Sequence, residues 1–487
     1  MASSGIELTS RHVITDPTPV NAPQSSDPEV DDEAAAPVQL PPVARREQAS
    51  VLLSAFLTIC LTIGYNQTYG VFQEYYLSST QTLLNPPPSS LPNPPTAELA
   101  FVGTLGAGLT WAGSIFVNPL ISRIEHSHYN HSHLSDPSSR SLFHRLGVKH
   151  VTILGVALMC CGFLLASFAM TVTQLLLTQG LLYGIGSSLL YFPLLGPAPE
   201  YFTKHRATAL GLILSGGGVG GLVLSPALRS LLSTLGAAWT LRVLAGLSLV
   251  VGLPVALAVP PSRFPTSQTG TTVARRRTHI QRSLLSQPAF LLSAVAAFTQ
   301  AAGAQLPLTF IPSYSVSLGF SAGTGATLLA TANVVNAVAR VITGYAGDRF
   351  GRLNALVVSL LGAVAAVFGL WLGSVSEGSN GGRLWLAFVV LYSVSAGGYY
   401  ALFPATIADV FGIRSYAAVN GFIYFIRGCG TMVGSPVGGT LLGKDSGGSG
   451  QYANVVYWDG ALLLGSAVCI LGVRWADAVR RGWMWRA

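Results

Sequence analysis

Long apolar runs dominate the pattern of hydrophobic and polar positions along this chain. One of them, residues 151–199, holds 49 residues without one Asp, Glu, Lys, Arg or His. A helix crosses a bilayer core with about 20 apolar residues, so this run is long enough for two membrane helices with a turn near 171–173. Comparable runs recur, and together they predict twelve membrane helices at 50–73, 99–122, 150–170, 173–196, 207–228, 238–259, 288–312, 321–346, 354–374, 384–408, 415–442 and 455–473.

The charged residues between these segments predict the orientation of the chain in the bilayer. An even number of spans places both termini on one side. With the termini inside, 21 of the 27 Lys and Arg residues lie in the cytoplasmic connections and tails, and only Arg229, Arg242, Arg383 and Lys444 lie outside. Because positive residues collect on the cytoplasmic side, we expect both termini in the cytoplasm. The expected location is the plasma membrane.

Composition agrees with a membrane protein and narrows the function classes. Hydrophobic residues make up 50% of the chain and charged residues 9%, against about 25% charged in soluble domains. The net charge of +8 is spread over the connections, which argues against nucleic-acid binding. There is no nucleophile triad, nucleotide loop or closed zinc motif, and the five histidines of 126–144 are too irregularly spaced to fix a metal geometry. The sequence therefore predicts no enzyme activity, no cofactor and no metal site.

Two polar stretches divide the chain. Residues 1–48 are rich in Pro, Ala, Ser and acids and lack an apolar signal region, which predicts a disordered cytoplasmic tail. Residues 260–287 form the longest polar connection between apolar segments. The sequence thus predicts an all-α membrane protein with two pseudo-symmetric six-helix bundles, 49–259 and 288–476, a central cytoplasmic linker at 260–287 and a short tail at 477–487.

A charged loop follows the apolar segment 321–346. Its sequence GYAGDRFGR at 344–352 matches the G-x-x-x-D-R-x-G-R loop of the major facilitator superfamily. A tight glycine turn there carries a carboxylate and guanidinium groups that can join two helices on the cytoplasmic side. In the first half Ser122 stands where the acid is expected, and an insert interrupts the motif. We predict that Asp348, Arg349 and Arg352 act in gating; the alternative is a solvated charged turn.

The two halves also carry similar sequences where one predicted helix ends and the next begins. The first half reads Glu200-x-Phe202 with a later Arg206, and the second reads Asp409-x-Phe411 with a later Arg414, at spacings that differ by one residue. Two such repeats about a central linker are typical of transporters with a substrate site between the halves. The predicted gating or structural set is completed by Lys204, Arg206, Glu200 and Asp409.

A longer signature narrows the family. The sequence YFTKHRATALGL at 201–212, continued by SGGGVGG at 215–221, resembles the Y-F-x-K-[RH]-R-x-x-A-x-G-x…G motif of monocarboxylate porters. The sequence YGVFQEYY at 69–76 resembles the G-V-F-Q-x-Y-Y of their fungal branch. The resemblance covers roughly 49–474. It implies the twelve-helix fold of the major facilitator superfamily and transport of short organic acids or riboflavin, or export of metabolites made by biosynthetic clusters.

Arg340 lies inside the predicted membrane segment 321–346. Asn333 and Asn336 precede it by seven and four residues, which places all three on one helix face. A charge in the membrane costs at least about 2.5–3.5 kcal/mol and indicates a functional site; the alternative is an arginine that snorkels or pairs structurally. The resemblance implies that Arg340 meets a substrate carboxylate. Porters of this family carry a proton-relaying Asp at the position of Asn336, so this chain lacks the titratable partner.

Three other segments add candidates for the substrate site. Asn66, Gln67 and Tyr69 lie in the segment 50–73, where animal porters place a lysine. Arg427 lies about midway along 415–442, either as a cavity cation or in a structural interhelical pair, and Tyr399 is a candidate pore-lining aromatic. Both ionisable groups of the family's proton relay are thus missing.

We therefore expect transport with a weak proton dependence. The alternative is coupling through Glu74, Glu200 or Asp409, which lie near helix ends and are expected to be structural.

These observations favour secondary transport of an organic anion or carboxylate-bearing metabolite by alternating access. The expected partners are a small anionic substrate and the lipid bilayer, with protons as a further candidate. One alternative is an efflux pump for a fungal secondary metabolite from a biosynthetic gene cluster, because the predicted cavity is rich in aromatics and poor in acids. A further alternative is a non-transporting nutrient sensor, for which the tail after the last helix is short.

Overall fold

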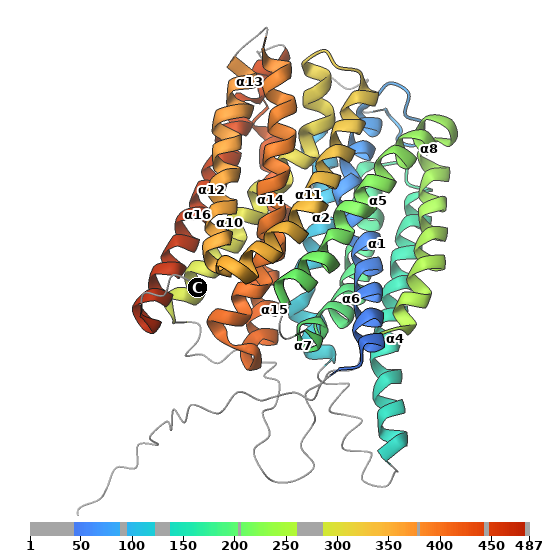
Figure 1. Ribbon diagram of the computed structural model, residues 1–487. Coiled ribbons are helices and arrows are strands. Elements are labelled where there is room, and N and C mark those ends of the chain that lie inside the picture. The colour runs from blue at the N-terminus through green and yellow to red at the C-terminus, as the bar shows by residue number, and fades with distance from the viewer. Residues whose placement is uncertain are drawn as a thin grey trace, which may run out of the picture. The chain divides into compact units, whose positions relative to one another are not determined.

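The fold was analysed in a computed structural model of the chain. The structure describes residues 43–87, 95–121, 137–202, 206–260, 286–376, 380–442 and 448–482, which all belong to the compact unit Pro42–Ala487. These residues are helical and contain no strand (Figure 1). Most of the predicted N-terminal tail and linker, the end of the C-terminal tail, and His126, His128, His131 and His133 lie outside the described residues.

The first half consists of the helices before the linker. They are α1 (Arg45–Leu77), α2 (Thr96–Ala112), α4 (Pro137–Ala166), α5 (Val172–Leu175), the π-helical turn η3 (Leu176–Leu182), α6 (Tyr183–Leu195), α7 (Ala198–Tyr201) and α8 (Arg206–Leu257). After a turn at Gly113, the apolar span of α2 continues to Ile121. Helix α4 begins at Pro137, well before the predicted segment 150–170, because a polar stretch continues the helix ahead of the apolar span Gly147–Ala166.

The second half consists of the helices after the linker. They are α10 (Pro288–Ser317), α11 (Ala322–Phe350), α12 (Arg352–Ala366), the π-helical turn η4 (Val367–Trp371), α13 (Leu372–Ser376), α14 (Gly381–Phe411), α15 (Ile413–Thr440), the 3-10 turn η5 (Gly448–Tyr452) and α16 (Ala453–Arg481). Gly351 separates α11 from α12 with a φ of 103°, a conformation that favours glycine. The last glycine of the 344–352 motif is therefore required by the turn.

The helices account for the twelve predicted membrane segments. Ten helical stretches among the described residues are long and apolar enough to cross a membrane. One of them, α8, is two helices joined at Gly236, where a φ of 75° reverses the chain (Figure 1). Helix α15, with 28 residues, is not among the ten and adds the remaining segment. The prediction of an all-α membrane fold is confirmed.

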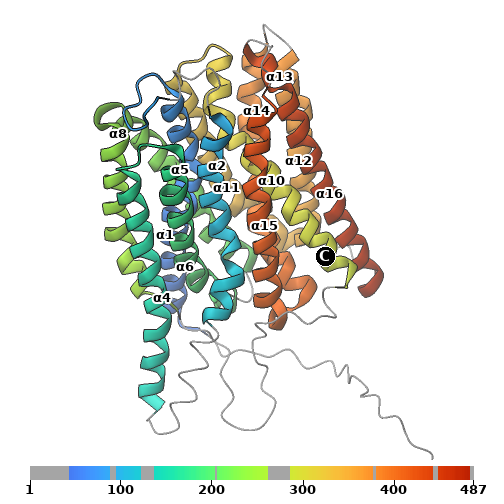
Figure 2. The same cartoon turned by 180° about the vertical axis from the view of Figure 1, so that it is seen from behind.

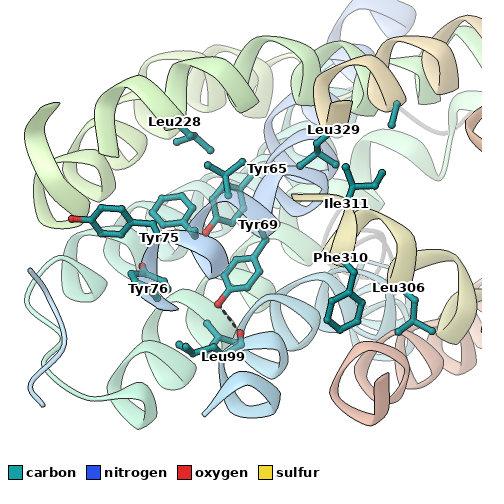
Figure 3. Packing of buried hydrophobic residues seen from close by; sticks show 14 of the residues in the cluster. Tyr65, Tyr69, Tyr75, Tyr76, Leu99, Leu228, Leu306, Phe310, Ile311 and Leu329 are labelled. Carbon is teal, nitrogen blue, oxygen red and sulfur yellow. Dashed lines mark hydrogen bonds between the residues drawn. The ribbon is translucent and has the colours of Figure 1, made fainter. Parts of the chain in front are cut away.

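The two halves meet along helices from each side. Helix α2 packs along α15 and α8 along α11, while α1 also contacts α10 (Figure 2). Gly70 of α1 allows a close approach to α10, since a Cβ there would stand 3.2 Å from the Leu308 carbonyl oxygen. A buried apolar cluster extends from the first half into the second and includes Tyr65 and Tyr69 of α1 and Phe310 of α10 (Figure 3). This apolar cluster closes the interface at the end of the halves where α1 finishes.

Glycine also sets the distance between α1 and α8 within the first half. A Cβ on Gly220 would stand 2.5 Å from the Cys60 carbonyl oxygen. A Cβ on Gly246, in the second part of α8, would meet nothing within 4 Å. Backbone cannot yield as a flexible side chain does, so an added methyl at position 220 must push the two helices apart.

We expect Gly220→Ala to destabilise the protein by about 1–3 kcal/mol, the usual cost of overpacking. Gly246→Ala should be neutral or slightly stabilising, because alanine is the better helix former by about 1 kcal/mol. Thermal unfolding of both variants in the same detergent measures the difference. Equal melting temperatures for the two variants would contradict the close contact of α1 with α8.

Candidate functional site

Arg340 lies where α11 crosses α8, between the two halves of the chain. Its side chain is only 1% exposed. The guanidinium Nη1 donates to the backbone carbonyl of Leu214 on α8. Gly211, three residues earlier on α8, makes the crossing possible, because a Cβ there would stand 2.5 Å from the Arg340 carbonyl oxygen. A glycine of the 201–221 signature therefore positions the arginine at the interface.

A pair of amides holds the other side of the Arg340 guanidinium. With the Gln67 amide oriented to satisfy its neighbours, its oxygen accepts from Arg340 Nη2 at 2.9 Å. Its nitrogen then donates to the Gly217 carbonyl at 2.9 Å and to Asn333 Oδ1 at 3.3 Å. Gln67, Asn333 and Arg340 were all predicted site residues, and the structure brings them together from α1 and α11. The polar side chains of this group come from both halves.

A second arginine lies beside this group. The Arg427 guanidinium of α15 lies 4.7 Å from the Tyr400 ring centroid, and Arg340 lies 4.4 Å from the same centroid. Arg427 is 2% exposed and also lies over the rings of Trp111, at 5.0 Å, and Tyr399, at 5.3 Å. The sequence analysis proposed Tyr399 for the site. The structure places Tyr400 between the two cations.

Neither buried arginine has a carboxylate partner among the described residues. The ion pairs that the structure describes join Arg229 to Glu74, and Arg352 to both Asp348 and Asp409. The Nε atoms of Arg340 and Arg427 have no hydrogen-bond partner in the described part of the chain. Two positive charges are therefore buried together without an acidic partner among the described residues, which is costly unless an anion joins them.

Three predicted site residues form hydrogen bonds away from Arg340. Asn66 donates to Thr110 Oγ1 at 3.3 Å, which places it between α1 and α2 within the first half. The Tyr69 hydroxyl donates to the Leu99 carbonyl at 2.7 Å (Figure 3). Asn336 donates to the Ser393 carbonyl at 3.2 Å, within the second half. None of these three hydrogen bonds joins the Arg340 group.

A charged cluster closes the opposite end of the interface from the apolar cluster. Arg352 donates to Asp348 Oδ1 from Nη2 at 2.7 Å and to Asp409 Oδ1 from Nη1 at 2.7 Å. Asp348 Oδ2 accepts from the backbone N–H of Thr208 at 3.0 Å and from its hydroxyl at 2.9 Å. Thr208 lies in the first turn of α8, whose free N–H groups favour a negative charge. Asp348 of the second half therefore caps a helix of the first half.

The other predicted gating residues make no described contact with the charged cluster. Arg349 is exposed on the far side of α11, over the Phe350 ring. Glu200 is buried in α7 at 6% exposure. Lys204 lies outside the described residues, and so does the side chain of Arg206, the first residue of α8.

One buried acid escaped the sequence analysis. Asp459 of α16 is fully buried, and neither of its carboxylate oxygens has a hydrogen-bond partner among the described residues. Its Oδ1 faces Gly303 of α10, where an added Cβ would stand 3.0 Å away. The available signal was a lone acid inside the apolar segment 455–473. Asp459 belongs to the interior of the second half.

A small cavity lies between the halves on the side of the charged cluster. It has a volume of about 20 Å³, room for one or two water molecules. Its walls include Asn118, Tyr191 and Leu214 of the first half and Asn420 and Tyr424 of the second. Tyr424 also lies under Arg427, at 5.8 Å. The cavity therefore borders a residue that contacts each arginine, Leu214 for Arg340 and Tyr424 for Arg427, and both arginines are buried in this conformation.

Comparison with known proteins places the chain among transporters. The family model for the Major Facilitator Superfamily matches residues 134–389, just over half of the chain. The chain is 26% identical over 434 residues to the MFS-type transporter pynF of Aspergillus niger, covering 88% of this chain and 89% of the relative. It is 28% identical over 359 residues to human monocarboxylate transporter 11, covering 70% and 71%. It is 25% identical over 427 residues to the aspyridones efflux protein apdF of Emericella nidulans, covering 87% and 77%.

These matches confirm the resemblance to the Major Facilitator Superfamily, and one of the relatives is a monocarboxylate transporter. The helices that are long and apolar enough to span a membrane, the paired halves and the buried polar group between them are those of a carrier. The chain therefore belongs to the Major Facilitator Superfamily and is a multi-pass membrane transporter.

Proposed function

We propose that this transporter carries an organic anion, in particular a carboxylate-bearing metabolite, across the plasma membrane by alternating access. The observation that supports the proposal most is the buried pair Arg340 and Arg427, which has no carboxylate partner among the described residues. An anion that enters between the halves compensates this charge. A neutral or cationic substrate leaves the cost of burial in place.

The proposal gives each end of the interface a role. The charged cluster of Asp348, Arg352 and Asp409 faces the cytoplasm together with both termini, as the distribution of basic residues favours. The apolar cluster around Tyr69 and Phe310 then closes the outer end. Opening one end while the other stays closed gives the substrate access to Arg340 from one side at a time.

Flux measurements with matched probes test the substrate charge. The full-length protein in proteoliposomes should transport benzoate and exchange it across the membrane, whereas benzamide, of the same shape without the charge, should not be transported. Transport of benzamide at the same rate would contradict an anion site. Binding of benzoate without any flux would instead favour the non-transporting sensor.

A second candidate is export of a secondary metabolite. Aromatic rings from both halves surround Arg427, and this surface suits a bulky conjugated acid better than a short aliphatic one. Two relatives, the aspyridones efflux protein apdF and the agnestins efflux protein AgnL12, carry this activity in their names. Deleting the gene in its source organism distinguishes the directions: export predicts that an acidic metabolite accumulates inside the cells, and uptake predicts slower growth on an organic acid.

A further inference from the structure

Arg427 is held by aromatic rings from both halves. Trp111 comes from α2 in the first half, and Tyr399, Tyr400 and Tyr424 come from α14 and α15 in the second; their ring centroids lie 4.7–5.8 Å from the guanidinium carbon. Such distances are those of cation–π contacts, which stabilise a cation without neutralising its charge. Arg427 therefore keeps a full positive charge in a site that is closed to water.

The surroundings of the two arginines differ. Amides and a backbone carbonyl surround Arg340: Gln67, Asn333 and the Leu214 carbonyl. Rings surround Arg427, and these rings also pack on each other, with Trp111 5.3 Å from Tyr424. One end of the site is thus polar and the other aromatic.

Tyr400 sets an upper limit on the distance between the two cations, because both contact its ring. Because its ring centroid lies 4.4 Å from one guanidinium carbon and 4.7 Å from the other, the two carbons lie within about 9 Å of each other. A rigid conjugated molecule with acidic groups at both ends spans a gap of this size. Trp111 and Tyr424 belong to opposite halves and their rings lie 5.3 Å apart, so separation of the halves exposes Arg427 and its rings together.

We propose that Arg427 and its rings form a second anion subsite, and that the substrate class is an aromatic or conjugated compound with two acidic groups. This inference rests on the proposed function, since it assigns the first acidic group to Arg340. The second group binds Arg427, and the conjugated body stacks on the rings that now hold this cation. A short aliphatic monocarboxylate fills only the Arg340 end.

Binding of probe molecules to the full-length protein in nanodiscs tests the subsite. The probes are naphthalene-2,6-dicarboxylate, 2-naphthoate and the aliphatic diacid adipate. The wild type should bind the naphthalene diacid about tenfold more tightly than 2-naphthoate, and more tightly than adipate. In Arg427→Gln the ratio between the naphthalene diacid and the monoacid should fall to about one, while Arg340→Gln should weaken both.

Arg242→Gln is a matched control. Arg242 also lies over two rings, Phe168 at 5.0 Å and Trp239 at 4.6 Å, but it lies in the second part of α8 and away from the arginine pair. This variant should keep the wild-type ratio. If Arg427→Gln keeps the ratio too, Arg427 only joins the halves and the subsite is overturned.

If Arg427→Gln does not fold, Trp111→Leu tests the subsite instead. It removes one ring and keeps both cations, so the preference for the naphthalene diacid over adipate should fall while the diacids still bind. An unchanged preference would overturn the aromatic part of the inference. The same measurement distinguishes failure of the proposed function from failure of the subsite. If the proposed function is wrong, no carboxylate probe binds the wild type.

Discussion

Arg340→Gln is expected to abolish transport of the carboxylate substrate. The guanidinium is buried between the halves and has no acid partner among the described residues, so its charge is available to a substrate anion. Removing one member of a buried, hydrogen-bonded charge pair costs about 2–5 kcal/mol, which corresponds to at least about 30-fold in affinity. Flux of labelled benzoate into proteoliposomes measures the loss.

Arg340→Lys should restore little of this activity. The structure uses two arms of the guanidinium at once, one toward the Leu214 carbonyl and one toward the Gln67 amide, and a lysine ammonium cannot reproduce that planar fork. Arg383→Gln is the control, because Arg383 is an exposed cation at the start of α14. A carrier that still transports benzoate at the wild-type rate after Arg340→Gln would contradict the anion site.

The sequence predicts the helices well because the membrane imposes one simple rule on them. Every span must be apolar over about 20 residues, and a run such as 151–199 cannot satisfy another environment. The rule does not mark where a helix continues beyond the bilayer. Helix α4 therefore begins at Pro137 and α1 at Arg45, both before the predicted apolar boundaries.

For the candidate site, the sequence could predict only which residues share a face of the same helix. Arg340 and Asn333 share a face of α11, so their proximity follows from helical spacing. Asn66 and Gln67 are neighbours in sequence, yet successive helical residues point about 100° apart, and Asn66 faces Thr110 while Gln67 faces Arg340.

Contacts between distant helices could not be read from periodicity. The position of Tyr400 between the two arginines depends on how α14, α11 and α15 are placed against each other, and nothing in the local sequence fixes that. The motif at 201–221 did identify the glycines of α8 as part of a family signature. It did not say that Gly211 makes its close approach at the Arg340 carbonyl.

Asp348→Ala is expected to shift the protein toward states that are open at the charged end, with expression near normal. Asp348 accepts two hydrogen bonds from Thr208 across the interface and two from Arg352, and its side chain is only 10% exposed. Hydrogen bonds to a charged group contribute about 1.5–3 kcal/mol, so losing the contacts to Thr208 should raise the open population about 10- to 100-fold. Transport should slow, because the closed state is a required step of the cycle.

Asp409→Asn is the matched comparison, since both members of the Arg352–Asp409 pair belong to the second half. It weakens the charged cluster but leaves the contact between Asp348 and Thr208 in place, so its effect on opening should be smaller. Spin labels on the α8 and α11 ends that flank Thr208 and Asp348 report the distance between the halves by pulsed electron resonance. If Asp348→Ala leaves both this distance distribution and the transport rate at wild-type values, the 344–352 loop is a solvated turn, and closure of this end depends on the packing of Gly344 against Ala207 alone.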